Sequence, residues 1–460
     1  MTSWHPDLSR LSGPRYQAIA DAIAVSIQQG ELEPGAKLPP QRDLAWRLGV
    51  TVGTVTRGYM LAEQRGLVSG EVGRGTYVRT AGGGHAPLLD EAESGVTDLS
   101  RNVPGIGEPA RLFAEALAAL GARGGLEALL AYAPAAGHAA HRAAGAAWIG
   151  RTGLKVSPEQ VVVTAGAQQA IAIVLSALAK PGERVLVEQL TYCGLIDAAR
   201  LLHLPLEGLP MDGEGVLPEA VDAACRAGGA RLLSLVPTNQ NPTLATMSQA
   251  RRQAIVEAAR RHDLLIVEDD VYGYLPEDRP PPIATLAPER TIYLASASKC
   301  MVPGLRVGWI AAPPALAELF ADGVHSHCIA EAALTAQIVS QWIEDGTADH
   351  LTRWHREQCR LRQALAAEIF AGFEMCAAPS SFHIFLTLPD PWRAQEFTDA
   401  ARAKGIVVVP AGTYAVGRVA APHAVRISLA AASGLATLRQ ALLTLAALAK
   451  AGPGARRAMV

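Results

Sequence analysis

Apolar residues gather in short runs along the second, larger part of the chain. Ala-rich segments with helical spacing lie between several of these runs, as at Gln168–Ala179 and Ser248–His262. Continuous apolar strands that alternate with helices are typical of a mostly parallel sheet covered on both faces. We therefore predict an α/β domain. Its expected strands begin at Val161, Arg184, Arg231, Leu264, Thr291 and Val307.

The pattern changes toward the C-terminus. Strands are expected at FHIFLTLP and AVRISLA, with helices near Gln395–Lys404 and from Leu435 onward. Mixed short strands and helices of this kind indicate a smaller α+β subdomain. We place the large part of the domain at about 99–325 and the small C-terminal part at about 326–450.

The N-terminal segment has a different pattern. Arg15–Gln29 carries Ile19, Ile23 and Ile27 on one helical stripe, and two further helical segments are separated at Leu48-Gly49-Val50. A hairpin punctuated by glycines follows, and then the Gly- and acid-rich stretch TAGGGHAPLLDEAESG. We predict a first domain at 1–79, a linker at 80–98 and the larger domain at 99–460.

Charge gives little information for the whole chain and more for its N-terminal part. The chain has 41 Lys and Arg against 43 Asp and Glu, a net charge of -2. Between Lys37 and Arg79, however, seven basic residues face three acidic ones, a local net charge of +4. A basic patch of this kind supports nucleic-acid binding by this part of the chain.

Cysteine spacing and the opening residues bear on the compartment. The six cysteines form no CxxC pair, so neither a zinc site nor a disulfide framework is expected. MTSWHPDLSR lacks the order of a secretory signal, and polar residues interrupt the uncharged stretch Val161–Ala179. We expect a cytoplasmic protein with no membrane span and no metal.

Three motifs in the larger domain carry candidate chemistry. TAGAQQA opens a helix after a strand, so backbone N–H groups near Ala167 and Gln168 can receive a phosphate. EDDVYGY places Asp269 at the carboxyl end of a strand, where α/β sheets usually bind ligands. SASKCMVPGLRVGW combines the amine of Lys299 with two hydroxyls and a guanidinium. Taken singly, each motif has a plain alternative: a packed turn, a solvated acidic strand end and a surface lysine.

Together these motifs resemble those of class I, fold-type I pyridoxal-phosphate aminotransferases, from about Leu99 to the C-terminus. The resemblance implies that Lys299 forms a Schiff base with pyridoxal 5'-phosphate and that Asp269 faces the pyridine nitrogen. It further implies that Asn241 and Tyr272 bind the phenolic oxygen and that Tyr192 stacks on the ring. The phosphate would be bound by Ala167, Gln168, Ser296, Ser298 and Arg306.

The same resemblance implies a homodimer and a carboxylate anchor. Tyr132, in YAPAAG, resembles the tyrosine that reaches the phosphate of the partner subunit, and Arg426, in VRISLA, resembles the anchor for a substrate carboxylate. A structural ion pair is the alternative for Arg426. One position departs from the family: the usual Asn-Pro-Thr-Gly ends here in Leu244, which puts the local turn and the access to the site in question.

The first domain resembles the winged helix-turn-helix of GntR-type transcription regulators. The resemblance implies that Thr51–Met60 enters the major groove of double-stranded DNA. The arginine that commonly opens this helix is replaced by Val52-Gly53. The expected DNA contacts are Arg42, Thr51, Thr54, Arg57 and, in the wing, Arg74. A winged helix that makes only protein contacts is the alternative.

A winged helix joined to an aminotransferase-like domain resembles the MocR/GabR-type branch of GntR regulators across nearly the whole chain. The resemblance implies a dimeric regulator that senses pyridoxal phosphate, alone or with a small amine or amino-acid effector, through imine chemistry at Lys299. The competing hypothesis is a working aminotransferase with an appended DNA-binding domain, because Lys299, Asp269, Tyr272 and Arg426 serve both functions. Leu244 favours the regulator without efficient turnover.

Overall fold

The structure is a computed structural model that describes residues 4–6, 14–33, 36–65, 67–71, 75–78, 95–105, 107–124, 126–417 and 420–453. The chain divides into two compact units, one formed chiefly by Met1–Asp90 and the other by Glu91–Gly417 with Pro422–Val460. Each unit is described by itself. Among the described residues, no helix combines the length and the apolar character needed to cross a bilayer.

The described residues of the smaller unit form three helices and a two-stranded antiparallel hairpin. The predicted stripe on the first helix is largely confirmed, since Ile19 and Ile23 are fully buried in the core of the unit and Ile27 packs against it. The second helix ends at Gly49, whose left-handed backbone (φ 63°) turns the chain toward the third. The elements are α1 (Arg15–Gln28), α2 (Gln41–Leu48), α3 (Val52–Gln64), β1 (Val68–Glu71) and β2 (Gly75–Val78).

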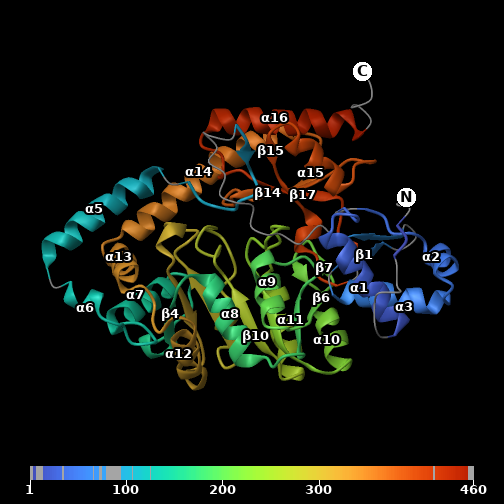
Figure 1. Ribbon diagram of the computed structural model, residues 1–460. Helices are drawn as coiled ribbons and strands as arrows, with labels where there is room; N and C mark the ends of the chain where they lie inside the picture. Colours follow the sequence, from blue (N-terminus) through green and yellow to red (C-terminus); the bar gives the residue numbers. More distant parts are fainter. Residues whose placement is uncertain are drawn as a thin grey trace. The chain divides into compact units, whose positions relative to one another are not determined.

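The larger unit is built on a seven-stranded sheet (Figure 1). All its strand pairs are parallel except those of β12, which runs antiparallel to both of its neighbours. The prediction of a mostly parallel sheet is confirmed. In spatial order the strands are β4 (Val161–Thr164), β12 (Gly308–Ala311), β11 (Thr291–Ser296), β10 (Leu265–Asp269), β9 (Ala230–Leu235), β5 (Arg184–Glu188) and β6 (Leu206–Leu209).

Helices cover both faces of this sheet, because successive strand residues point to opposite sides. Val162 packs with α8 (Ala167–Leu178), α9 (Cys193–Leu201) and α12 (Pro314–Cys328) in one core. Its neighbours Val161 and Val163 pack in a second core on the other face. The helices of that face are α5 (Gly107–Arg123), α7 (Ala139–Gly150), α10 (Pro218–Arg226), α11 (Gln249–Arg261) and α13 (Ala333–Glu344).

A second, four-stranded antiparallel sheet forms the C-terminal α+β part. Its strands lie in the order β13 (Met375–Cys376), β14 (His383–Thr387), β17 (Ala424–Ser428) and β16 (Val409–Pro410). This sheet shares one core with α14 (Thr347–Ile369), α15 (Ala394–Arg402) and α16 (Leu435–Ala451).

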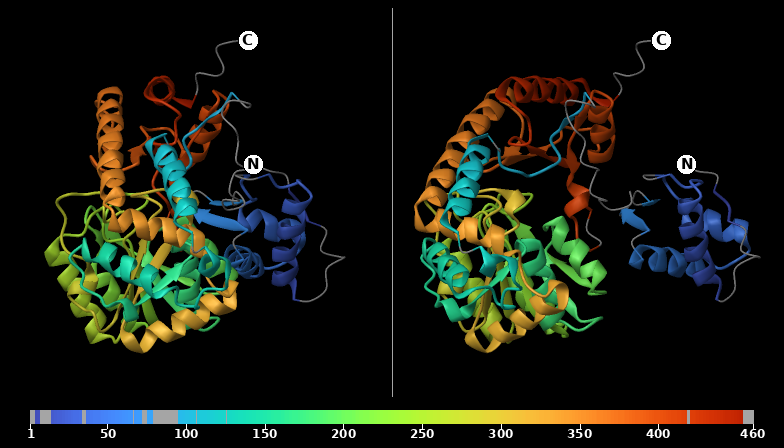
Figure 2. Two further views of the ribbon diagram at one scale, coloured as in Figure 1. Left: turned by 90° about the vertical axis from the view of Figure 1, so that its left-hand side faces the viewer. Right: turned by 60° about the vertical axis from the view of Figure 1, so that its left-hand side comes forward.

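The long helix α14 reaches from the large sheet to the small one (Figure 2). In its first half His355 Nε2 donates to the carbonyl of Met301 at 2.7 Å, and further along Gln363 Nε2 donates to the carbonyl of His383 at 2.9 Å. The two sheets of the larger unit are thus held by one rigid element.

A short parallel pair brings the start of the larger unit to the small sheet. Thr97–Asp98, at the end of the expected linker, form β3 and pair with β15 (Ile406–Val407). The pairing continues as Ser428 N donates to the carbonyl of Leu99 at 2.9 Å. This contact places the residues after Leu99 beside β17. A two-residue strand has no period that a sequence pattern can show.

Candidate active site and DNA-binding unit

Lys299 and Asp269 lie at the same edge of the large sheet. Asp269 is the last residue of β10 and pairs in register with Leu294 of β11, and Lys299 follows three residues after the end of β11. The carboxyl ends of these two parallel strands therefore bring the amine and the carboxyl group together, as the sequence motifs predicted.

The amine of Lys299 lies in a site that disfavours its charged form. Nζ donates a hydrogen bond to the carbonyl of Asn102 and lies 5.7 Å from the centre of the Tyr272 ring. Desolvation, aided by the positive charge of Arg426, lowers the pKa of Lys299 to about 8, although Asp269 opposes this shift. A useful fraction of the amine is therefore neutral near physiological pH.

Asp269 and Glu188 are buried carboxyl groups at this edge. Burial raises the pKa of Asp269 to about 7, against the opposing effects of the Val271 N–H and of Lys299. Burial also raises the pKa of Glu188, at the end of β5, to about 7. Glu188 accepts from Val236 N at 2.6 Å and from Thr191 Oγ1 at 2.7 Å. We did not predict Glu188, although RVLVE ends in an acid at a strand terminus just as LLIVED does.

Asn102 and His383 extend the site and were also missed. Asn102 Nδ2 lies 2.9 Å from the Tyr272 hydroxyl and 3.1 Å from His383 Nδ1, and His383 Nε2 lies 3.1 Å from the carbonyl of Pro242. Since that carbonyl only accepts, Nε2 carries the proton and Nδ1 accepts from Asn102. Burial, together with the charge of Arg426, lowers the pKa of His383 well below its usual value, so the ring is neutral.

Arg426 lies on β17 with its guanidinium buried in the site. Nη1 donates to Asn241 Oδ1 at 3.1 Å, Nη2 donates to the carbonyl of Ser100, and the group lies 5.2 Å from the centre of the Tyr414 ring. Within the described part of the chain, its Nε has no hydrogen-bond partner. A buried donor without a partner is available to bind an anionic ligand.

The turn that carries Leu244 keeps a glycine-like backbone. Leu244 is buried with φ 64°, and its N–H donates to the carbonyl of Gln240 at 2.6 Å. Gln240 in turn donates from Nε2 to the carbonyl of Leu190 and accepts from Thr243. The local turn thus forms with leucine, because surrounding contacts hold a conformation that a branched residue alone disfavours.

A cradle for a phosphate lies at the N-terminus of α8. Gly166 precedes the helix with φ 82°, and a Cβ there would lie 2.6 Å from Arg306 Nη2. Arg306 Nη2 donates to the carbonyl of Ala165 at 3.1 Å, and Ser296 Oγ lies 2.9 Å from Ser298 Oγ. The missing side chain leaves backbone N–H groups, a guanidinium and two hydroxyls close together, which fits the phosphate of pyridoxal phosphate.

The remaining expected site residues differ in position. Gln168 in the first turn of α8 donates from Nε2 to the carbonyl of Gly194 at 2.7 Å. Tyr192 lies close enough to Tyr272 and Asp269 to interact with them electrostatically, and burial raises its pKa. Tyr132 is 83% exposed.

In the smaller unit, the expected DNA contacts fall on α2 and α3. Arg42 and Arg57 are exposed. Thr51 is exposed and caps α3, since its hydroxyl accepts from Thr54 N at 3.2 Å, whereas Thr54 is half-buried. Arg74 lies outside the described residues.

These two units define a class of protein: a helix-turn-helix unit joined to a pyridoxal-phosphate domain of the aminotransferase fold. Residues 94–445 match the family model "Aminotransferase class I and II", and residues 15–78 match "Bacterial regulatory proteins, gntR family". The chain is 30% identical over 444 residues to the uncharacterized HTH-type transcriptional regulator YdeF of Bacillus subtilis, covering 96% of both chains. The protein belongs to this family of MocR/GabR-type HTH transcriptional regulators.

The chain is also similar to aminotransferases. The chain is 30% identical to a 2-aminoadipate transaminase of Thermus thermophilus, over 63% of this chain and 74% of the enzyme. The crystal structure of LysN, an α-aminoadipate aminotransferase from the same organism, matches with a TM-score of 0.71 and 26% identity over 80% of this chain and 95% of that chain. The cofactor of this domain is pyridoxal phosphate, and the smaller unit binds DNA.

Proposed function

We propose that the DNA binding of this regulator responds to pyridoxal phosphate at Lys299 and to an amine that reacts there. The observation that carries the proposal is the amine of Lys299 beside Asp269 and the phosphate cradle, on a chain that also has a GntR-type unit. An effector changes DNA affinity only if it binds two arrangements of the protein with different affinity.

Some residues of the site would bind the cofactor, and others would take part in its reaction with an amine. When bound, the cofactor supplies an aldehyde that condenses with amines and a ring that withdraws electrons. Lys299, with its lowered pKa, provides a neutral amine. Asp269, once ionised, stabilises a proton on the ring nitrogen. Asn241 and Tyr272 would bind the phenolic oxygen, Tyr192 would stack on the ring, and Ala167, Gln168, Ser296, Ser298 and Arg306 would bind the phosphate.

Arg426 points to an effector that carries a carboxylate. Its guanidinium is buried beside Asn241, and its Nε has no acceptor among the described residues. A planar guanidinium binds a carboxylate through two parallel hydrogen bonds. An amino acid is therefore a better candidate than a simple amine.

The DNA contacts and the assembly complete the proposal. The exposed Arg42, Thr51 and Arg57, with Thr54 and the wing residue Arg74, would contact operator DNA. The exposed Tyr132 would reach the phosphate bound by the partner subunit of a homodimer. We place this dimer in the cytoplasm, with domain boundaries near residues 79 and 98.

A DNA-shift assay on the intergenic region beside the gene tests the proposal. Apo protein, protein with pyridoxal phosphate, and protein with pyridoxal phosphate plus candidate amino acids should shift the DNA with different affinities. Lys299→Ala should bind DNA but lose the difference. Failure to bind this DNA in every state would refute the proposal.

A working aminotransferase is the second candidate, favoured by the similarity to the Thermus transaminase and by the intact set of Lys299, Asp269, Tyr272 and Arg426. Steady consumption of an amino acid and a 2-oxo acid would establish it. Change in DNA affinity without turnover would establish the regulator alone.

A further inference from the structure

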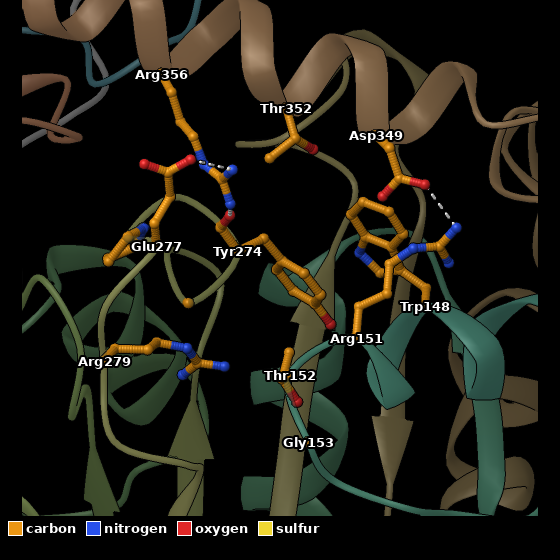
Figure 3. A pocket seen from close by; sticks show the side chains of 12 residues that line it. Trp148, Arg151, Thr152, Gly153, Tyr274, Glu277, Arg279, Asp349, Thr352 and Arg356 are labelled. Atoms are coloured by element: carbon orange, nitrogen blue, oxygen red, sulfur yellow. Dashed lines mark hydrogen bonds and ion pairs between the residues drawn. The ribbon is translucent and has the colours of Figure 1, made fainter.

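A pocket opens in the larger unit among residues that the cofactor site does not use (Figure 3). It has a volume of about 440 Å³ and lies between the end of α7, the loop after β10 and the first turns of α14. None of the residues expected to hold the cofactor lines it. Its walls are rich in guanidinium groups, from Arg151, Arg279 and Arg356.

Two of the three arginines are held at the walls by close contacts. Arg356 donates from Nε and Nη2 to the carbonyls of Leu275 and Tyr274, at 2.7 and 2.8 Å, and lies 3.3 Å from Glu277. Arg151 donates to Asp349 at 2.8 Å. Because Asp270 also lies beside Arg279, each of the three guanidinium groups has one carboxylate partner, and these six groups together carry no net charge.

Arg279 supplies the observation that points to a ligand. Its side chain is only 7% exposed, and Nη1 donates to Asp270 at 2.7 Å. Nη2 is buried and has no hydrogen-bond partner among the residues that the structure describes. In Figure 3 this guanidinium extends across the pocket floor toward Thr152. A buried charged donor without an acceptor is unfavourable, so an acceptor from outside the chain is expected.

The pocket and the cofactor site share two chain segments. Asp270, the partner of Arg279, directly follows Asp269. The hydroxyl of Thr352, in the pocket wall, lies 3.4 Å from the carbonyl of Cys300, which directly follows Lys299. A ligand in the pocket would thus contact the side chains of Arg279 and Thr352, which in turn lie against the residues directly after Asp269 and Lys299.

We propose that this pocket is a second ligand site, which binds the oxyanion group of a small molecule, a carboxylate or a phosphate, through Arg279 and Arg356. Burial alone would lower the pKa of the Arg279 guanidinium, but Asp270 and Tyr293 raise it above its ordinary value, so it stays charged. The planar donors of arginine match both kinds of oxyanion.

Calorimetric titration of the full chain, saturated with pyridoxal phosphate, tests this site without depending on DNA binding. Saturating the cofactor site prevents the added anion from binding at the α8 cradle. Inorganic phosphate and succinate are titrated separately at constant ionic strength, adjusted with chloride. One saturable site per chain is expected for at least one of them, and the ligand that binds identifies the group recognised.

Three variants make the test specific. Arg279→Lys keeps a cation beside Asp270 but removes the donor Nη2. Arg356→Gln removes a positive charge from the opposite wall. Each variant should bind the anion at least tenfold more weakly than the wild type. Arg360→Gln, on the same helix α14 but outside the pocket lining, should bind as the wild type does. Thermal unfolding checks that each variant is folded.

The proposal fails if neither anion shows saturable binding, which would mean that the pocket holds water only. It also fails if both pocket variants bind with wild-type affinity, because the bound anion would then lie elsewhere.

Discussion

At the scale of single residues, burial sets the chemistry of the site. Lys299 and Asp269 have ordinary pKa values that differ by more than six units, yet desolvation brings them to about 8 and about 7. Both groups are therefore able to change charge near neutral pH. The same burial keeps His383 neutral and leaves an N–H of Arg426 without an acceptor among the described residues.

The pKa of Lys299 predicts how fast the amine combines with pyridoxal phosphate at different pH. Only the neutral amine reacts, so the rate should rise about tenfold per pH unit below about 8 and level off above it. Stopped-flow absorbance of apo protein mixed with the cofactor measures this rate. A lysine with an ordinary pKa of about 10.4 would give a rate still rising at pH 10, which would contradict the prediction.

Arg426→Lys should reduce the affinity for amino-acid effectors by about 10- to 100-fold, because lysine keeps the charge but loses the bidentate geometry. The measurement is the change in cofactor absorbance during titration with the amino acid. Amines without a carboxylate should bind equally well to both proteins. Equal loss for both ligand types would show that Arg426 acts on the cofactor rather than on a carboxylate.

At the scale of elements, close approach and capping shape the DNA-binding unit. Gly58 on α3 faces α1, where an added Cβ would lie 2.8 Å from Ile19 Cγ2 and 3.1 Å from the carbonyl of Tyr16. At Gly53, on the first turn of the same helix, the nearest atom to an added Cβ is Thr51 Oγ1 at 3.8 Å. The neighbouring helix therefore leaves no room for a side chain at Gly58, whereas Gly53 has room for one.

Gly58→Ala should destabilise the smaller unit by about 1 kcal/mol, because overpacking against the buried Ile19 outweighs the gain in helix propensity. Hydrogen exchange of α1 and α3 in the full chain measures the change. The matched control Gly53→Ala avoids the clash and should slow exchange or leave it unchanged. Slower exchange in Gly58→Ala would mean that the two helices separate without cost.

At the scale of the whole molecule, the proposed dimer makes each site depend on two chains. Tyr132 is exposed in its own subunit, whereas Lys299 is half-buried near Asp269. If Tyr132 serves the partner subunit's phosphate site, a mixed dimer can hold one complete site that neither variant holds alone.

Mixing Lys299→Ala and Tyr132→Ala chains should therefore restore cofactor binding of wild-type affinity in about half of the sites of the mixed dimers. Each variant alone should bind weakly or form no lysine adduct. Fluorescence titration with pyridoxal phosphate after mixing measures the recovery. Absence of recovery in verified mixed dimers would show that Tyr132 acts within its own subunit or has no role.

The sequence alone determined most of the local elements and the fold class of the cofactor domain. Six apolar runs became six strands of the large sheet, because burial on both faces leaves a continuous apolar signal. The strand β6 escaped prediction, since Glu207 and Gly208 lie at a half-buried edge where that signal is weak. The order of the motifs was sufficient for the family, whereas the roles of Lys299 and Asp269 stay predictions.

Only the tertiary structure decided what surrounds those motifs. Asn102 contacts Tyr272 and His383, which lie 170 and 281 residues further along the chain. The strand β12 runs antiparallel to both of its neighbours, a direction that the apolar pattern does not predict. The pocket around Arg279 also unites three distant segments. Spacing along a chain records local periodicity, whereas contacts between distant segments, and the desolvation that shifts pKa values, exist only after the chain has packed.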